Sequence, residues 1–459
     1  MKARQALRIL LAGLGTSVVP LDTAVNIAFP EITGSFDLPI QMIQWVIICY
    51  VLTYSSLMLA FGRAGDVWSH GRIFRIGLLW SAIAYLLCAT APSYGWLLFC
   101  RFLQGIGASL IVSCAPALVT GLFPEDRRSR AVSAFTIMYA IGSAVGPLLG
   151  GALVQIWGWP AVFWFRAPIA LIALLFLEGL PAAPRSTVRE PIDLVGAFLL
   201  ALAISSLLLM FNQLRDLDRH AFLPVTLAAV GVISIIGFIR WEDRVAQPIV
   251  NLGFFRTEQF AAVNLAGVLI YLTSFAVLLF GPYYFARFTN LSAAVAGGVL
   301  GMSFVGGIAA SPLAGWLIER SPAPRVAALG ALLCGTGLAV IGEWDRGTSW
   351  QIIAIIGALI LQGFGVGIFQ VAYMEIVMRT LPRQHRGVAG SIAMLSRSLG
   401  VVGGATVLTL AFNAIESFEL AAGQTPVEGF LTSFSLIFRL GGITSGLAGL
   451  LVLAAPSRR

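Results

Sequence analysis

The segment VVPLDTAVNIAFP, residues 18–30, places one carboxylate, Asp22, and one amide, Asn26, in an otherwise apolar run. A carboxylate that is alternately wetted and paired with a cation can take up and release a proton, so Asp22 is a candidate proton carrier. The alternative is structural, because Asn26 follows Asp22 by one helical turn and the two could share a hydrogen bond between helices. Which reading holds depends on the elements that surround the segment.

Other chemistries are excluded by residue type. Lys2 is the only lysine, so the chain has neither a phosphate-loop lysine nor a lysine for a Schiff base. The three histidines are too scattered for a metal cluster, and the five cysteines lie in apolar segments without ligand spacing. We therefore expect neither an enzyme nor a metal site.

The composition is that of an integral membrane protein. Hydrophobic residues make up 58% of the 459 residues and charged residues only 11%, and the mean hydropathy is +0.90. Apolar segments long enough to cross a bilayer recur along the chain. We count fourteen, near residues 9–32, 41–61, 74–92, 95–121, 131–155, 160–180, 192–211, 221–239, 259–283, 292–317, 326–342, 349–378, 387–412 and 431–455.

The distribution of positive charge supports this count. With the N-terminus inside, most of the 29 lysines and arginines fall in cytoplasmic loops and at the termini, while the outer loops hold only Arg215, Arg219, Arg287 and Arg346. The net charge of +8 is therefore an orientation signal and not a sign of nucleic-acid binding. We expect a multi-pass protein of the bacterial plasma membrane with both termini in the cytoplasm.

The chain contains an internal repeat. LQGIG at 103–107 matches LQGFG at 361–365, and Gly142 and Gly146 meet Gly400 and Gly404 at the same offset. A second pair of motifs repeats Gly62, Asp66 and Arg72 as Gly315, Glu319 and Arg325. These matches predict two six-helix transport domains, residues 1–185 and 246–459, with an inserted helical hairpin at 186–245. In repeats of this kind the substrate site lies between the halves.

Six segments together resemble the major facilitator superfamily, and in particular its fourteen-span drug:proton antiporters. They are LDTAVNIAFPEI (21–32), IQWVIICYVL (43–52), GRAGD (62–66), RFLQGIGAS (101–109), GSAVGPLLGG (142–151) and QPIVNLGFFR (247–256). The resemblance implies proton-driven export of small, often amphipathic molecules by alternating access, with the proton as coupling ion, no cofactor and a functional monomer. Two departures are a longer loop after Asp66 and Arg166, where such proteins commonly carry asparagine.

The resemblance also assigns roles to residues. It pairs Asp22 with Arg101 for proton coupling, since the first and fourth spans adjoin in that fold. The antiporter motif is Gly142, Gly146, Pro147, Gly150 and Gly151, whose four-residue steps give one small helix face. We expect an inner gate, or alternatively a cluster of charges that only orients the protein in the membrane, formed by Gly62, Asp66, Arg72, Arg128, Glu319 and Arg325. Candidates for the substrate cavity are Asn26, Trp45, Tyr50, Gln104, Tyr139, Glu375 and Arg397.

Several alternatives stay open. Glu375 precedes Arg379 by four residues, so a surface ion pair is at least as plausible as a cavity acid. Arg166 and Arg439 could extend toward the outer surface, and the positive excess within the spans leaves anionic substrates open. A carrier for a metabolite, peptide or siderophore, or a non-transporting receptor, is the alternative to a drug exporter.

Overall fold

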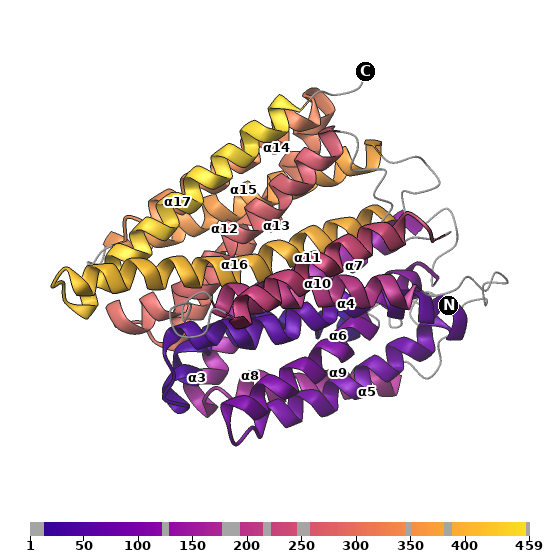
Figure 1. Ribbon diagram of the computed structural model, residues 1–459, viewed down its shortest axis with the longest axis horizontal. Coiled ribbons are helices and arrows are strands. Elements are labelled where there is room, and N and C mark those ends of the chain that lie inside the picture. The colour runs from indigo at the N-terminus through magenta and orange to yellow at the C-terminus, as the bar shows by residue number, and fades with distance from the viewer. Residues whose placement is uncertain are drawn as a thin grey trace. The chain divides into compact units, whose positions relative to one another are not determined.

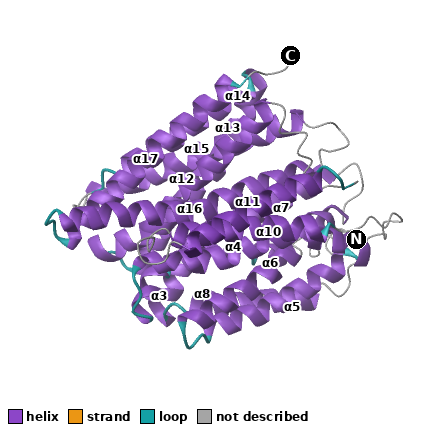
Figure 2. Cartoon of the chain, viewed as in Figure 1, coloured by secondary structure: helices purple, strands orange, loops and turns teal. Residues whose placement is uncertain are grey.

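The computed structural model describes residues 13–121, 128–176, 193–213, 222–245, 258–344, 350–380 and 388–455. Within these ranges the regular structure is helical and contains no strand, as Figure 2 shows. Ten of the described helices are long and apolar enough to cross a membrane, and Ile141–Trp157 and Ala161–Leu175 are shorter apolar helices. The chain is therefore an all-helical multi-pass membrane protein, and the count of fourteen spans stays a prediction.

Contacts within the chain divide it into two compact units, Met1–Leu207 with Leu227–Ile249 and Leu208–Thr226 with Val250–Arg459. The helices are labelled in Figure 1. Up to residue 249 they are η1 (Pro20–Thr23), α2 (Ala24–Ile27), α3 (Phe29–Ser35), η2 (Ile40–Ile43), α4 (Gln44–Trp68), α5 (His70–Ala89), α6 (Tyr94–Gly121), α7 (Arg128–Trp157), α8 (Ala161–Trp164), α9 (Arg166–Phe176), α10 (Leu194–Gln213) and α11 (Phe222–Glu242). The remaining helices are α12 (Glu258–Phe288), α13 (Ala293–Arg320), α14 (Ala323–Ile341), α15 (Trp350–Thr380), α16 (Val388–Ala421) and α17 (Pro426–Ala454).

The first apolar span is interrupted where Asp22 lies. Residues 13–17 are helical, and a turn then leads into η1, α2 and α3. Pro20 begins η1 and Pro30 lies in the first turn of α3, positions that suit proline because the missing N–H is not needed there. The Thr23 hydroxyl donates to the carbonyl of Pro20 and to that of Ser143 in α7. Asp22 is thus held on a short 3-10 turn and not on a continuous helix.

The glycine face of α7 packs against this turn. A Cβ on Gly142 would lie 3.1 Å from the carbonyl oxygen of Ser17, and one on Gly150 would lie 2.7 Å from that of Ala24. Gly146 approaches Thr23 and the backbone nitrogen of Ala24 just as closely. Since backbone cannot yield as a side chain does, these glycines fix how near α7 comes to the span that carries Asp22.

The packing of small residues recurs in the second half of the chain. A Cβ on Gly105 in α6 would lie 2.8 Å from the Tyr50 carbonyl oxygen of α4. Gly363, its repeat partner in α15, lies even closer to the Ser303 carbonyl of α13. Equivalent helices therefore pack through equivalent glycines, as expected for a structural repeat.

Helices α10 and α11 present large apolar side chains outward. Phe198 is 64% exposed in α10, and Ile233 is 67% exposed in α11. The Trp241 indole nitrogen donates to the Asp193 carboxylate, 2.7 Å away, at the ends of the two helices. Exposed apolar helices of this length suit a lipid environment.

Candidate functional site

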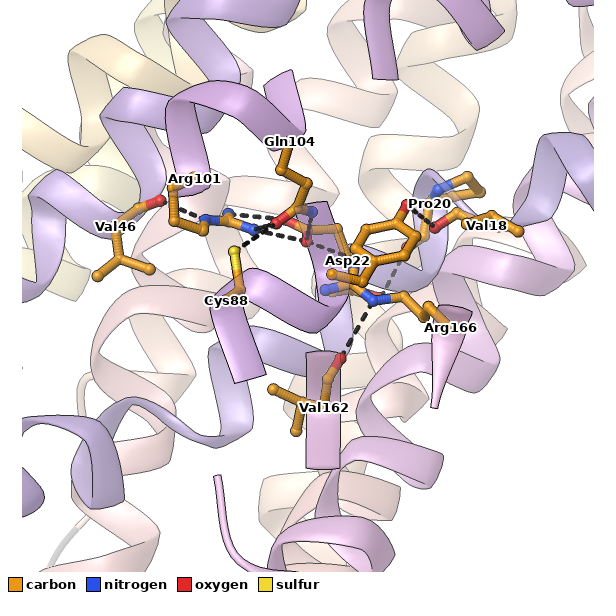
Figure 3. A network of polar contacts seen from close by, with 11 residues as sticks. Val18, Pro20, Asp22, Val46, Cys88, Arg101, Gln104, Val162 and Arg166 are labelled. Carbon is orange, nitrogen blue, oxygen red and sulfur yellow. Dashed lines mark hydrogen bonds and ion pairs between the residues drawn. The ribbon is translucent and has the colours of Figure 1, made fainter. Parts of the chain in front are cut away.

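The Asp22 carboxylate accepts hydrogen bonds from three side chains (Figure 3). Arg101 binds it through two parallel bonds, Nη1 to Oδ1 at 2.8 Å and Nη2 to Oδ2 at 2.9 Å. The Gln104 amide donates to Oδ1 at 2.8 Å. Arg166 Nη1 donates to the same oxygen at 2.6 Å. Arg101, Gln104 and Arg166 donate all four of these bonds. Asn26, one turn further along the chain, donates none of them and is half-buried.

Arg101 is fixed on α6 by the backbone of α4. Its Nε donates to the Val46 carbonyl oxygen at 2.8 Å, and its Nη1 also reaches Gln104 Oε1 at 2.8 Å. The guanidinium carbon lies 4.3 Å from the centre of the Tyr50 ring. Only 2% of the Arg101 side chain is exposed. The fork of donors, the aromatic face and the burial together set one orientation for this group.

Arg166 approaches Asp22 from the start of α9. Its Nε donates to the Val162 carbonyl oxygen at 3.1 Å, and its guanidinium carbon lies 4.4 Å from the centre of the Tyr85 ring. The side chain is 0% exposed, so Arg166 does not extend toward the outer surface, which was the alternative that the sequence left open. Its Nη2 is buried and has no hydrogen-bond partner among the residues that the structure describes. The residue that departs from the resembled family is thus a member of the Asp22 site.

This arrangement answers why a charge is tolerated in the first span. An ionised carboxylate inside a bilayer costs at least about 2.5 kcal/mol unless it is paired, and here two guanidinium groups and an amide surround it. Two positive charges face one negative charge, so the cluster as a whole is not neutral. Asp22 is the most accessible of the three charged groups, with 14% of its side chain exposed. A small opening at Asp22 would let water or a ligand reach the pair.

The residue that corresponds to Asp22 in the second unit carries no charge. Gly142 packs against Ser17 and Pro20, and its repeat partner Gly400 packs against Val268 and Tyr271. The contacted residues are 251 positions apart in the two halves, and the same offset makes Thr273 the counterpart of Asp22. The Thr273 and Ser445 hydroxyl groups lie 2.9 Å apart, and Gln362, the repeat partner of Gln104, accepts from Ser303 at 2.6 Å. Among the described residues, the second half of the repeat therefore has a hydroxyl group where the first half has the Asp22 carboxylate.

Two predicted intramembrane charges lie in exposed ion pairs. Arg439 makes two bonds to Glu343, each 2.8 Å long, with the side chains 51% and 61% exposed. Glu375 pairs with Arg379 one turn later, and Arg379 is 68% exposed. The surface reading of Glu375 is thus the one that the geometry favours. Arg397 is half-buried, with its guanidinium carbon 5.8 Å from the centre of the Tyr271 ring.

The predicted gate residues are only partly described. Arg72, Glu319 and Arg325 are exposed. The side chains of Asp66, Arg128 and Tyr139 lie outside the described part of the structure. A Cβ on Gly62 would lie 3.8 Å from the Ser113 Cβ, an ordinary distance, whereas a Cβ on Gly65 would lie 2.8 Å from Cys114 Sγ.

The remaining candidates divide by burial. Tyr50 and Gln104 are buried at the charge cluster, while Trp45 is half-buried. Sequence reasoning missed Tyr85 and Phe163, whose rings face the guanidinium of Arg166. No spacing pattern marks an aromatic residue that serves a charge on another helix. In the described residues no three His, Cys, Asp or Glu side chains gather as metal ligands.

An all-helical membrane protein with a buried charge cluster on an interrupted span has the architecture of a membrane carrier. The chain belongs to the Major Facilitator Superfamily, whose pattern matches residues 9–255 and 263–459. It is accordingly a non-enzymatic transporter, and carriers of this family generally need no cofactor.

Relatives across most of the chain are named as transporters. The riboflavin transporter RibZ of Clostridioides difficile is 26% identical over 84% of this chain and 83% of its own length. The puromycin resistance protein pur8 of Streptomyces alboniger is 28% identical over 95% of this chain and 89% of its own length. The multidrug transporter protein MdtP of Bacillus subtilis is 25% identical over 85% of this chain and 72% of its own length. The chain thus has multidrug efflux proteins among its homologues.

Solved structures show the same fold. A peptide transporter POT in complex with sulfate aligns with a TM-score of 0.72 at 17% identity, covering 97% of this chain and 94% of its own. A bacterial homologue of the human lysosomal transporter Spinster aligns with a TM-score of 0.70 at 14% identity, covering 100% and 99%. At these identities the likeness concerns the fold alone.

Proposed function

We propose that the protein exports small amphipathic molecules in exchange for protons, by alternating access across the plasma membrane. The observation that carries this proposal is the Asp22 carboxylate, which lies in the first span, is only 14% exposed and is bonded to Arg101 and Arg166. Multidrug and antibiotic resistance proteins among the relatives support the direction of transport. The functional unit in this proposal is one chain.

Asp22 would serve as the proton carrier through the making and breaking of its ion pairs. Paired as in this structure, the carboxylate is ionised and its charge is balanced locally. Opening toward water at the 14% exposed Asp22 would let a proton replace the guanidinium groups as its partner. Inward movement of each proton is worth about 2.3 kcal/mol per 100 mV, which can drive a substrate outward.

The glycine face of α7 is suited to transmit that change. Gly146 and Gly150 contact residues 23 and 24, directly after Asp22, and Pro147 lies between them inside the helix. A shift of the 3-10 turn would therefore displace α7, because backbone in contact cannot deform independently. Coupling is thus the proposed role of this motif, beyond tight packing.

The proposed architecture has fourteen spans, with transport domains at 1–185 and 246–459 and an inserted hairpin at 186–245. Both termini then face the cytoplasm, and residues around 217 lie outside. Single cysteines at 188 and 217, in a background without the native cysteines, test this with an impermeant maleimide added to intact cells. Labelling at 217 alone is expected; protection at 217 with labelling at 188 would overturn the topology.

The function is tested by Asp22→Asn in proteoliposomes with an imposed pH gradient. Asparagine stands in for the protonated acid and cannot cycle, so uphill export should be lost while downhill exchange is partly kept. Glu343→Gln is the matched control, since Glu343 also binds an arginine through two bonds but is 61% exposed. Uphill export by Asp22→Asn at the level of the parent protein would show that Asp22 does not carry the proton.

A carrier for one metabolite is the second candidate, because a relative of comparable coverage is named as a riboflavin transporter. The two functions differ in selectivity. Growth inhibition by a panel of unrelated toxic compounds, with and without expression of the protein, separates them. Protection against several unrelated compounds is expected of the exporter, and protection against none favours the metabolite carrier.

A further inference from the structure

The Asp22 cluster has two deficits that its own residues do not resolve. Arg101 and Arg166 bring two guanidinium groups to the single carboxylate of Asp22. Arg166 donates through Nε and Nη1, but its Nη2 is buried and has no acceptor in the described part of the chain. An anionic group placed at Nη2 would supply the missing negative charge and the missing acceptor together.

The surroundings of the unpartnered donor are aromatic. The Arg166 guanidinium carbon lies 4.4 Å from the centre of the Tyr85 ring and 5.6 Å from that of Phe163. Tyr50 covers the guanidinium of Arg101 in the same way, at 4.3 Å. These rings stack on the guanidinium groups and fix their orientation, so the acidic end of a ligand would meet arginines that are already held in place.

We propose that Arg166 recognises an acidic group of the transported molecule, a carboxylate or a phenolate, so that the preferred substrates are amphipathic organic anions. The inference rests on the proposed export of amphipathic molecules, but not on proton coupling. Asp22 is the most exposed member of the charged cluster, so the ligand approaches along its side and meets the guanidinium groups there.

The charge count fixes how the anion and Asp22 affect each other. Both bind the same guanidinium groups, so neutralising Asp22 strengthens anion binding. Exchange of an anion for a proton then requires that the anion leave before Asp22 is protonated. A monoanion also leaves the cell with the membrane potential, whose interior is negative. Export of an acidic molecule therefore draws on the potential directly, whether or not a proton returns.

The test measures equilibrium binding to the purified full chain in nanodiscs, without any gradient. Two fluorescent probes share one xanthene ring system: fluorescein, which is anionic at pH 7.5, and rhodamine 6G, which is cationic. Wild type is compared with Arg166→Asn, with Asp22→Asn, and with Arg439→Asn as a control that removes an exposed arginine. Monodispersity on size exclusion establishes that each variant is folded.

Wild type should bind fluorescein more tightly than rhodamine 6G. Arg166→Asn should lower the fluorescein affinity at least about tenfold without lowering that for rhodamine 6G, a loss of about 1.4 kcal/mol. Asp22→Asn should raise the fluorescein affinity, the opposite direction from a folding defect, and Arg439→Asn should change neither. Wild type that binds fluorescein no better than Arg166→Asn does would overturn the proposal.

Replacing sodium gluconate by sodium chloride identifies the source of the anion. If chloride leaves the fluorescein affinity unchanged, the free Nη2 donor of Arg166 binds the acidic group of the substrate. If chloride abolishes fluorescein binding, this donor binds a small inorganic ion, and the proposed substrate class is wrong. Proton coupling is decided separately by the pH-gradient assay, so either conclusion can fail while the other stands.

Discussion

The charge count within the Asp22 cluster predicts a ranking of stabilities. Asp22→Asn leaves two buried guanidinium groups without a counter-charge, because the side chains of Arg101 and Arg166 are 2% and 0% exposed. Removing one member of a buried pair costs about 3 to 5 kcal/mol, and asparagine retains part of the hydrogen bonding, so the lower end is expected.

Arg166→Asn should behave differently. It loses the 2.6 Å bond to Asp22, worth about 1.5 to 3 kcal/mol for a charged group. The loss is offset because the excess charge and the unpartnered Nη2 disappear, while Asp22 keeps the two bonds from Arg101. The net change should lie within about 1 kcal/mol of zero.

The native cysteines supply the assay. Cys88, Cys100, Cys114 and Cys334 are buried, so a thiol-reactive fluorescent dye reports unfolding in detergent. With about 2 to 4 °C per kcal/mol for a unit of this size, Asp22→Asn should lower the apparent Tm by roughly 10 °C and Arg166→Asn by less than about 4 °C. Glu343→Gln, in the exposed pair, should change it by less than about 2 °C. If Arg166→Asn lowers the apparent Tm as much as Asp22→Asn does, then the excess-charge reasoning is refuted.

Three further outcomes are expected. Gly150→Ala places a Cβ 2.7 Å from the backbone oxygen of Ala24, so transport and the apparent Tm should both fall, whereas Gly95→Ala, which has nothing within 4 Å, should change neither; equal Tm values for the two would contradict the packing argument. Asp66→Asn should reduce transport while substrate affinity in detergent is largely kept, and unchanged transport at matched membrane expression would leave Asp66 a topological charge. Glu375→Gln should leave both transport and Tm nearly unchanged, since it removes only an exposed ion pair; loss of transport would return Glu375 to the substrate path.

Much of the fold follows from composition and periodicity alone. A bilayer imposes helices of about 20 apolar residues, so an apolar chain of this kind reveals its class without long-range information. The matching segments LQGIG and LQGFG predicted equivalent helices in the two halves. In the structure Gly105 packs against the backbone of α4, and Gly363 packs against the backbone of the corresponding helix α13. The interruption of the first span was less visible, although Pro20 and Pro30 were signals for it.

The sequence by itself determined that Asp22 needed a partner, because an unpaired carboxylate within an apolar span is too costly. The family resemblance named Arg101 as one partner, whereas the second partner, Arg166, was identified only by the tertiary structure. Arg101 and Arg166 are 79 and 144 residues away, and pairing over such separations depends on how helices pack, which no local pattern encodes. Arg166, Arg397 and Arg439 look alike as arginines in apolar runs, yet the first is fully buried against Asp22 and the last is half exposed against Glu343. Burial, and with it the energy of a charge, is set by neighbours that are remote in the chain.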